Sequence, residues 1–157
     1  MPRQPFIVRE RVRWSDCDPM GIIRFDAYTR FMELGEGEMF RSVGIGYREF
    51  ASRFGITLPR RVMHLEYPSP PRLDELLEVA VYVSEVGETS LRMNFDAYGD
   101  GGLLRMAGYL VLVCVFDGPD RGDAIRRMAW PSAFLEALAP YRLTVDEART
   151  ARAAGAA

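Results

Sequence analysis

The densest cluster of polar residues in the sequence is the segment Asp-Cys-Asp-Pro-Met-Gly at residues 16–21. Its two aspartates, Asp16 and Asp18, precede a stretch with the apolar spacing of a helix. The first backbone N–H groups of a helix have no intrahelical partner and lie in a positive field, so they can bind an oxyanion. A carboxylate just before them could act as a base or a nucleophile on a carbonyl group bound there. Either aspartate could instead only satisfy a turn, since Asp side chains often hydrogen-bond the nearby backbone.

Other side chains that could transfer a proton lie further along the chain. His64 is the single histidine, in a strand-like stretch with apolar neighbours. It is a candidate secondary acid or base, and it could instead be a structural histidine. Cys17 has no neighbouring histidine to deprotonate it, so we interpret it as a small buried residue and not as a nucleophile.

The composition excludes several classes of chemistry. All twenty basic residues are arginine, which excludes Schiff-base, lysine-nucleophile and P-loop phosphate chemistry. One histidine and two cysteines are too few for a multi-histidine metal site, a four-thiolate zinc site or a disulfide scaffold, so we expect no metal and no cofactor. The formal charge of −2 gives no general attraction to nucleic acid or anionic membranes.

No targeting or membrane segment is expected. The first ten residues lack the pattern of a signal peptide. The longest apolar run, Leu103–Phe116, contains Arg105 and is shorter than the ~20 residues that a membrane-spanning helix needs. We therefore expect a soluble, cytoplasmic protein with neither nucleic acid nor membrane as a partner.

The length of the chain and the spacing of its apolar residues predict the fold that positions these side chains. With 157 residues, of which 48% are apolar, the chain has the size and composition of one globular domain. Apolar spacing predicts helices over Asp26–Val43, Tyr47–Phe54 and Pro131–Leu138, and strands over Phe6–Trp14, Arg61–Tyr67, Leu76–Val86, Ser90–Tyr98 and Leu103–Phe116. This order predicts an α+β fold with one long helix against an antiparallel sheet. We expect a single domain over residues 1–145 and a flexible tail over 146–157, frayed from Ala148.

Three segments together resemble the 4-hydroxybenzoyl-CoA thioesterase-like hotdog proteins. The first is Trp-Ser-Asp-Cys-Asp-Pro-Met-Gly-Ile-Ile at 14–23, followed by the start of the long helix; the others are residues 65–77 and 86–91. The resemblance implies the hotdog fold, in which an antiparallel sheet wraps a long central helix. It also implies a homodimer, or a dimer of dimers, built by joining two sheets edge to edge with acyl sites at the interface. The implied activity is hydrolysis of an acyl-CoA or acyl-carrier-protein thioester.

The resemblance also assigns roles to individual residues. The second aspartate of the family motif is its catalytic carboxylate, and that position here is Asp18. The thioester oxygen is polarised by a backbone N–H where the helix begins, at Phe25, and we interpret Asp16 as a turn residue. Hotdog thioesterases of a second type place their carboxylate on the long helix, so the resemblance also makes Glu36, with Glu33 and Glu38, a candidate secondary acid or base. The alternative is that these glutamates are solvated or structural. The residues expected to contact the substrate are Gly21, Ile22, Arg60, Arg61, Thr89, Ser90 and Arg92.

The sequence departs from the family pattern at several positions. Many relatives carry His or Tyr at the position of Phe25 and Asn at that of Ala27, so side-chain assistance is missing there. Some relatives place basic residues where Gly87 and Glu88 stand, and Glu88 would repel the phosphates of CoA. These departures keep a second hypothesis open: a non-catalytic hotdog module that binds an acyl thioester or interacts with a carrier protein.

Overall fold

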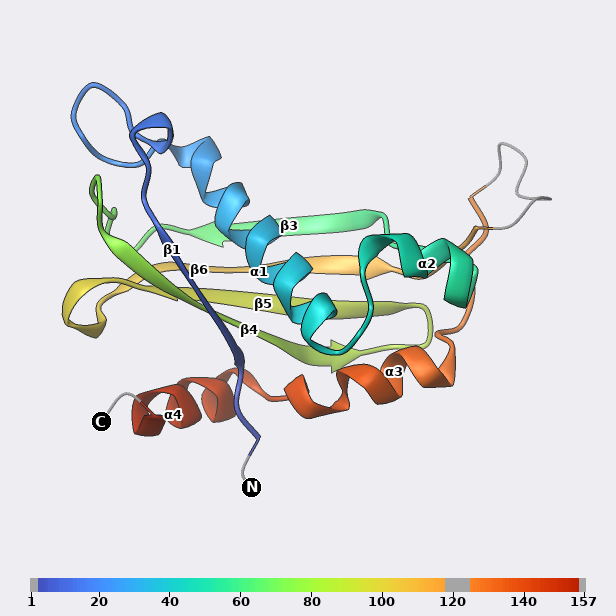
Figure 1. The fold of residues 1–157 in the computed structure, drawn as a ribbon. Helices are drawn as coiled ribbons and strands as arrows, with labels where there is room; N and C mark the ends of the chain where they lie inside the picture. The colour runs from blue at the N-terminus through green and yellow to red at the C-terminus, as the bar shows by residue number, and fades with distance from the viewer. Residues whose placement is uncertain (1–2, 118–124, 156–157) are drawn as a thin grey trace.

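The computed structural model describes residues 3–117 and 125–155. Its main element is a five-stranded antiparallel sheet with the strand order β1-β4-β5-β6-β3 (Figure 1). The strands are β1 (Phe6–Arg11), β3 (Arg60–Glu66), β4 (Leu76–Val86), β5 (Ser90–Tyr98) and β6 (Leu104–Val113). Helix α1 (Tyr28–Ser42) packs across one face of this sheet. The expected α+β hotdog fold is therefore confirmed.

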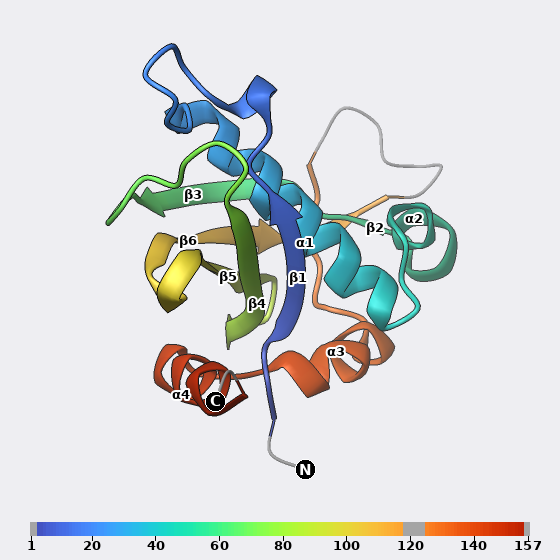
Figure 2. The same cartoon turned by 60° about the vertical axis from the view of Figure 1, so that its left-hand side comes forward.

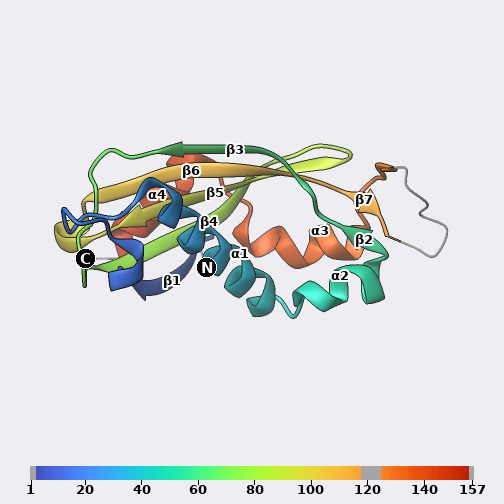
Figure 3. The same cartoon turned by 90° about the horizontal axis from the view of Figure 1, so that it is seen from above.

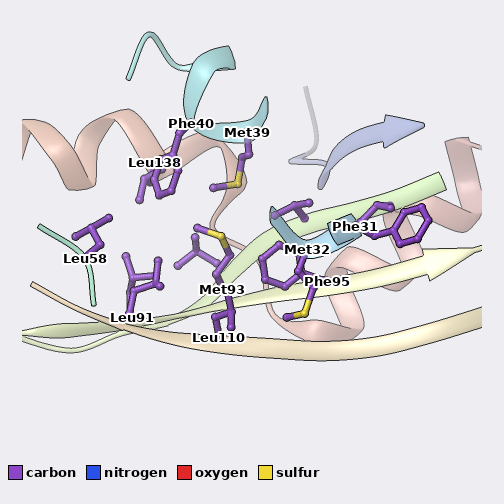
Figure 4. Packing of buried hydrophobic residues seen from close by; sticks show 14 of the residues in the cluster. Phe31, Met32, Met39, Phe40, Leu58, Leu91, Met93, Phe95, Leu110 and Leu138 are labelled. Carbon is purple, nitrogen blue, oxygen red and sulfur yellow. The ribbon is translucent and has the colours of Figure 1, made fainter. Parts of the chain in front are cut away.

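Alternating side chains along the strands build the core between α1 and the sheet. Every second residue of β5, from Leu91 to Ala97, is buried against this core. The apolar residues of α1 recur at the three- and four-residue spacing that places them on one helix face. Figure 4 shows the packed side chains, which include Phe31, Met32, Met39, Phe40, Leu91, Met93, Phe95 and Leu110.

A glycine sets how closely α1 approaches the sheet. Gly35 is buried in the middle of the helix, and a Cβ atom built on it would lie 2.7 Å from Cγ2 of Val81 on β4. Atoms at that separation overlap, so only a residue without a side chain fits unless the neighbour moves. The close approach explains why the helix keeps a residue that lowers its intrinsic stability by about 1 kcal/mol relative to alanine.

Two shorter helices extend the layer of α1. Helix α2 (Tyr47–Phe54) leads into the two-residue strand β2 (Ile56–Thr57), which pairs with β7 (Val115–Phe116). Helix α3 (Ser132–Leu138) contributes Phe134 and Leu138 to the same core. Figure 3 shows α1 and α2 on the same side of β3 and β6.

The C-terminal segment is a helix and not the frayed tail that the sequence led us to expect. Helix α4 spans Val145–Gly155 and lies on the face of the sheet away from α1 (Figure 2). Arg149 binds the buried carboxylate of Asp96 on β5 at 3.0 Å, and Arg152 binds Glu78 on β4 at 3.1 Å. These ion pairs hold an Ala/Arg-rich segment whose apolar pattern alone is too weak to predict docking. Residues 156–157 lie outside the described part of the chain.

Two predicted strand boundaries also differ. The first strand ends at Arg11 instead of Trp14, because Trp14–Asp16 forms a 3-10 turn in which the Asp16 carboxylate accepts the N–H of Arg13 at 2.8 Å. The last predicted strand, Leu103–Phe116, divides at Cys114 into β6 and β7. Over residues 3–117 and 125–155, no helix is both long and apolar enough to cross a membrane.

Candidate active site

The loop between β1 and α1 holds Asp18 on a tight turn. The N–H of Asp18 donates to the carbonyl of Ile22 at 2.9 Å, and the N–H of Gly21 donates to the carbonyl of Asp18 at 3.0 Å. Gly21 has a φ of +75°, and a Cβ atom there would contact nothing. The turn therefore needs glycine for its backbone conformation and not for space. A further bond from Ile23 N–H to the carbonyl of Pro71, at 3.3 Å, ties the loop to the segment before β4.

The carboxylate of Asp18 forms few hydrogen bonds within the protein. One oxygen, Oδ1, accepts the N–H of Met20 at 2.8 Å. The residue is half-buried, and within the described residues no ion pair engages its carboxylate. Asp18 therefore keeps acceptor capacity for a substrate or a water molecule.

Asp16, two residues earlier, is fully engaged inside the protein. Its side chain is 5% exposed and binds Arg30 of α1, with Arg30 Nε at 2.9 Å from Oδ1 and Nη2 bound to Oδ2. Burial alone would raise the pKa of Asp16, but the hydrogen bonds from Arg30 and from the Arg13 N–H outweigh it, and the pKa lies below its ordinary value. These contacts give Asp16 a structural role.

The start of the helix lies directly after this loop. A single 3-10 turn, Phe25–Ala27, runs into α1. Phe25 is the first residue of that turn, so its N–H has no acceptor within the helix. Its side chain is 77% exposed. Arg24 binds Asp26 through Nε at 3.0 Å and donates to the carbonyl of Ser15 at 2.8 Å.

A cavity of about 420 Å³ follows α1 on its side toward β3. It begins at Thr29, one turn beyond Phe25, and reaches Glu36 after seven residues, about 10 Å along the helix axis. The lining residues are Thr29, Met32, Glu33, Glu36, Tyr47, Arg60, Met63 and Leu110. An elongated group held at the start of the helix could therefore extend along α1.

The far end of this cavity carries an ion pair between a buried carboxylate and a half-exposed guanidinium. Glu36 is 1% exposed, and both of its oxygens accept from Nη2 of Arg60 on β3, at 2.9 and 2.7 Å. Burial raises the pKa of Glu36 above its ordinary value, despite the opposing effect of Arg60. Burial, reinforced by the negative charge of Glu36, raises the pKa of the neighbouring Tyr47 to about 12.

The other proton-transfer candidates lie away from this cavity. Met63 of β3 lines it, whereas the next residue, His64, is stacked on Tyr109 with ring centroids 5.1 Å apart and bonded to Glu66 at 3.0 Å. Alternation along the strand thus turns His64 to the opposite face of the sheet. Burial, followed by the charges of Asp16 and Asp18, raises the pKa of Cys17, so its reactive thiolate form is disfavoured.

The structure does not gather the predicted substrate-binding residues in one place. Gly21 and Ile22 belong to the Asp18 loop, but Thr89 and Ser90 lie at the turn between β4 and β5, at the other end of the sheet (Figure 1). The three arginines are also apart. Arg60 is in the α1 cavity, Arg61 is exposed on β3, and Arg92 is bonded to Glu85 at 3.1 Å with its guanidinium over the ring of Tyr109 on the opposite face.

Sequence reasoning missed Thr29 and Tyr47 as cavity residues, and it missed the contact between Glu36 and Arg60. A carboxylate and a guanidinium separated by 24 positions give no periodic signal. The one available sign was Glu36 itself, an acidic residue at a helix position that also faces the core. Within the described residues, no three His, Cys, Asp or Glu side chains gather as a metal-binding group.

Comparisons with known proteins identify the family of this chain. The family model of the thioesterase-like superfamily matches residues 12–138. An acyl-CoA thioester hydrolase, YbgC of Escherichia coli O6:H1, is 28% identical over 106 residues, which cover 67% of this chain and 78% of that protein.

Two solved structures share the fold. A mutant 4-hydroxybenzoyl-CoA thioesterase in complex with 4-hydroxybenzoyl-CoA has a TM-score of 0.75 at 19% identity and covers 85% of this chain and 97% of its own. A Staphylococcus aureus protein in complex with CoA has a TM-score of 0.79 at 18% identity and covers 92% of this chain and 90% of its own. Since the family model spans most of the sequence, this chain belongs to the thioesterase-like superfamily.

Proposed function

We propose that this protein hydrolyses acyl-CoA thioesters and that Asp18 is the carboxylate that performs the chemistry. The observation that supports the proposal is that Asp18 lies on a tight turn of the loop between β1 and α1, with its carboxylate in no ion pair among the described residues. Membership of the thioesterase-like superfamily and the relative described as an acyl-CoA thioester hydrolase support the reaction type.

The reaction places specific demands on the residues around the carbonyl. Hydrolysis adds water across the C–S bond and releases a carboxylic acid and the thiol of CoA. In the tetrahedral transition state the carbonyl oxygen gains negative charge, which the N–H of Phe25 would stabilise. Because a backbone N–H is the donor, the absence of a polar side chain at this position is compatible with the role.

Asp18 can serve the reaction by two routes. It can attack the carbonyl to give a mixed anhydride that water then hydrolyses, or it can take a proton from an attacking water molecule. Both routes require an ionised carboxylate, and both are lost when the carboxylate becomes an amide.

The proposal also concerns the carrier of the acyl group, which is either CoA or an acyl carrier protein. Arg60, Arg61 and Arg92, the arginines expected to contact the substrate, lie apart in the structure and do not form a common site for the phosphates of CoA. Glu88 is exposed on the turn between β4 and β5. An acyl carrier protein offers a single phosphodiester and needs fewer such contacts. We therefore keep both acyl-CoA and acyl carrier protein as substrates to compare.

The experiment is a turnover assay on a panel of acyl-CoAs, with the released thiol detected chemically. The panel should include straight chains of increasing length and aromatic acyl groups. Turnover of one group of substrates, abolished in Asp18→Asn, is the expected result. If calorimetry shows tight binding of acyl-CoA and no substrate is turned over, the proposed enzyme activity is wrong, and the protein is a non-catalytic module that binds acyl thioesters.

A further inference from the structure

The far end of the α1 cavity carries charged groups that are bonded to each other. Along the helix the cavity is bordered by the apolar side chains of Met32, Met63 and Leu110, together with Thr29 and the exposed Glu33. Where it ends, it meets the buried carboxylate of Glu36, the guanidinium of Arg60 and the phenol of Tyr47. An acyl pocket for a plain hydrocarbon has no use for charged groups at that position, because burying them costs free energy.

The polar groups at this end are not saturated by one another. Arg60 uses Nη2 alone to bind both oxygens of Glu36. A guanidinium has five N–H donors and a carboxylate has about four acceptor positions, so each partner retains hydrogen-bonding capacity. Tyr47 adds a hydroxyl that can both donate and accept.

The charges at this end of the cavity favour some polar ligands over others. Arg60 is the one cation among the lining residues and is already paired with Glu36, while Glu33 is exposed to solvent. A carboxylate on the substrate would approach the buried carboxylate of Glu36 with no further cation in the lining to balance it, and it would lose hydration there. A hydroxyl is neutral, donates to Glu36 and accepts from Arg60, so it matches the groups present.

We infer that this cavity selects acyl groups that carry a hydroxyl at the end distant from the thioester, through the Glu36–Arg60 pair. The inference rests on the proposed function, since it assumes that the thioester lies at the start of α1. The cavity extends about 10 Å from Thr29 to Glu36. The acyl group is therefore a chain that runs along the helix, with the hydroxyl beyond its apolar part. Glu36 and Arg60 are specificity residues in this scheme, and Asp18 alone carries the chemistry.

The test compares substrates of equal length that end in methyl, hydroxyl or carboxylate, as acyl-CoA thioesters. For the wild-type protein we expect kcat/KM for the best hydroxyl-ended chain to exceed that of its methyl-ended match at least about tenfold, the scale of one hydrogen bond to a buried charged group. The carboxylate-ended chain should be the poorest of the three. Equal values for the hydroxyl and methyl ends, or a preference for the methyl or carboxylate end, would overturn the inference.

A double variant tests whether the ion pair is the cause. Glu36→Leu combined with Arg60→Met removes both charges together and leaves no unpaired charge in the core, a replacement that proteins commonly tolerate. The ratio of kcat/KM between hydroxyl-ended and methyl-ended chains should fall to about one. A ratio that stays at its wild-type value would exclude the pair as the specificity element.

The chain offers a closely matched control on the other face of the sheet. Arg149 and Asp96 form an ion pair with side-chain exposures of 45% and 3%, against 46% and 1% for Arg60 and Glu36. Arg149→Met with Asp96→Asn removes this pair and should leave the selectivity ratio unchanged. If it lowers the ratio as much as the first double variant does, selectivity follows general stability, and the assignment to Glu36 and Arg60 is wrong.

Binding measurements separate this inference from the proposed function. Asp18→Asn protein should bind the hydroxyl-ended acyl thioester more tightly than the methyl-ended one, as measured by calorimetry, although it does not turn either over. Hydroxyl selectivity in binding without turnover by the wild-type protein would contradict the proposed reaction and retain the selective cavity. Turnover that depends on Asp18 but shows no preference for the hydroxyl-ended chain would support the proposed reaction and contradict the selective cavity.

Discussion

The carboxylate of Asp16 and the guanidinium of Arg30 form a two-point ion pair that joins the loop after β1 to helix α1. The same guanidinium donates to the carbonyl of Arg11 at 3.0 Å, at the end of β1. One arginine thus fixes the strand, the loop and the helix relative to one another. Asp18 stands two residues further on the loop that this contact orients, and its own carboxylate is in no ion pair among the described residues.

Replacing Asp18 by Asn should abolish most of the activity without unfolding the protein. Loss of one essential acid–base group lowers kcat about a hundredfold or more. Because the amide can still accept the Met20 N–H through its oxygen, the thermal midpoint should stay near that of the wild type. Steady-state kinetics and a thermal melt on the same preparation check both parts, and a variant with wild-type kcat would refute the assignment.

Replacing Asp16 by Asn should act on stability instead. The change leaves the Arg30 guanidinium without its buried partner and should cost about 2–3 kcal/mol of unfolding free energy, since Arg30 keeps a weaker contact to Glu10. The pKa of Asp16 in the folded protein lies below its ordinary value of 3.8. Its contribution is therefore present above that value and is lost as the pH falls through the lower, folded-state pKa. Urea unfolding of wild type and variant over a pH series should show the difference shrinking only in acid; a difference that disappears near neutral pH would contradict this.

Replacing Gly35 by Ala should destabilise the fold although alanine favours helices. The gain in helix propensity is about 1 kcal/mol, but the new methyl group would stand 2.7 Å from Val81 Cγ2, and overpacking of this kind costs about 1–3 kcal/mol. We expect a net loss of about 1 kcal/mol by chemical denaturation. In a Val81→Ala background the clash is gone, so the same change should become neutral or stabilising, and additivity of the two changes would argue against the contact.

The protein should form homodimers through β3. The sheet has two edges. The exposed residues of β1 are Arg9 and Arg11, and exposed charge is a common protection against edge pairing. Strand β3 carries exposed charge at Arg61 but also exposes apolar side chains. On β3, Val62 and Met63 are 39% and 57% exposed. Light scattering at micromolar concentration should give twice the chain mass. Val62→Glu should shift the protein toward monomer and Arg9→Ala should not; a monomeric wild type would contradict the prediction.

Removal of the nucleotide from the substrate should have little effect on binding. Charge-assisted contacts to phosphate contribute about 1.5–3 kcal/mol each, but the candidate arginines of this chain do not converge: Arg60 binds Glu36 and Arg92 binds Glu85. The KM for acyl-pantetheine should therefore lie within about tenfold of that for the matching acyl-CoA. A rise of a hundredfold or more on truncation, about 2.7 kcal/mol, would establish a nucleotide site in the assembled protein.

The sequence predicted most of the scaffold because its elements bury one face at a regular period. Ser90–Tyr98 and Leu76–Val86 alternate clearly, and the structure has strands at those residues. The C-terminal helix was missed because Ala148 is its one fully buried residue, and its other anchors are ion pairs to strands far away in the chain. Long-range polar contacts of this kind follow from the fold and not from local spacing.

The sequence predicted the candidate site only in part, and for the same physical reason. Local chemistry identified the Asp16–Asp18 segment, but it could not decide which aspartate is free, because that depends on Arg30 fourteen residues later. The polar end of the cavity could not be predicted from the sequence either, because Arg60 on β3 lies beside Glu36 only once the sheet has formed.

The docking of α4 also bears on the order in which the chain folds. An isolated helix of eleven residues is marginal in water, and the anchors of α4 are Glu78 and Asp96, on two adjacent strands. The anchoring surface exists only once β4 and β5 have paired. Because synthesis runs from the N-terminus, every strand of the sheet is made before α4. A nascent chain that has not yet reached α4 holds Asp96 without its arginine, so docking of α4 is a late step that covers this face of the sheet.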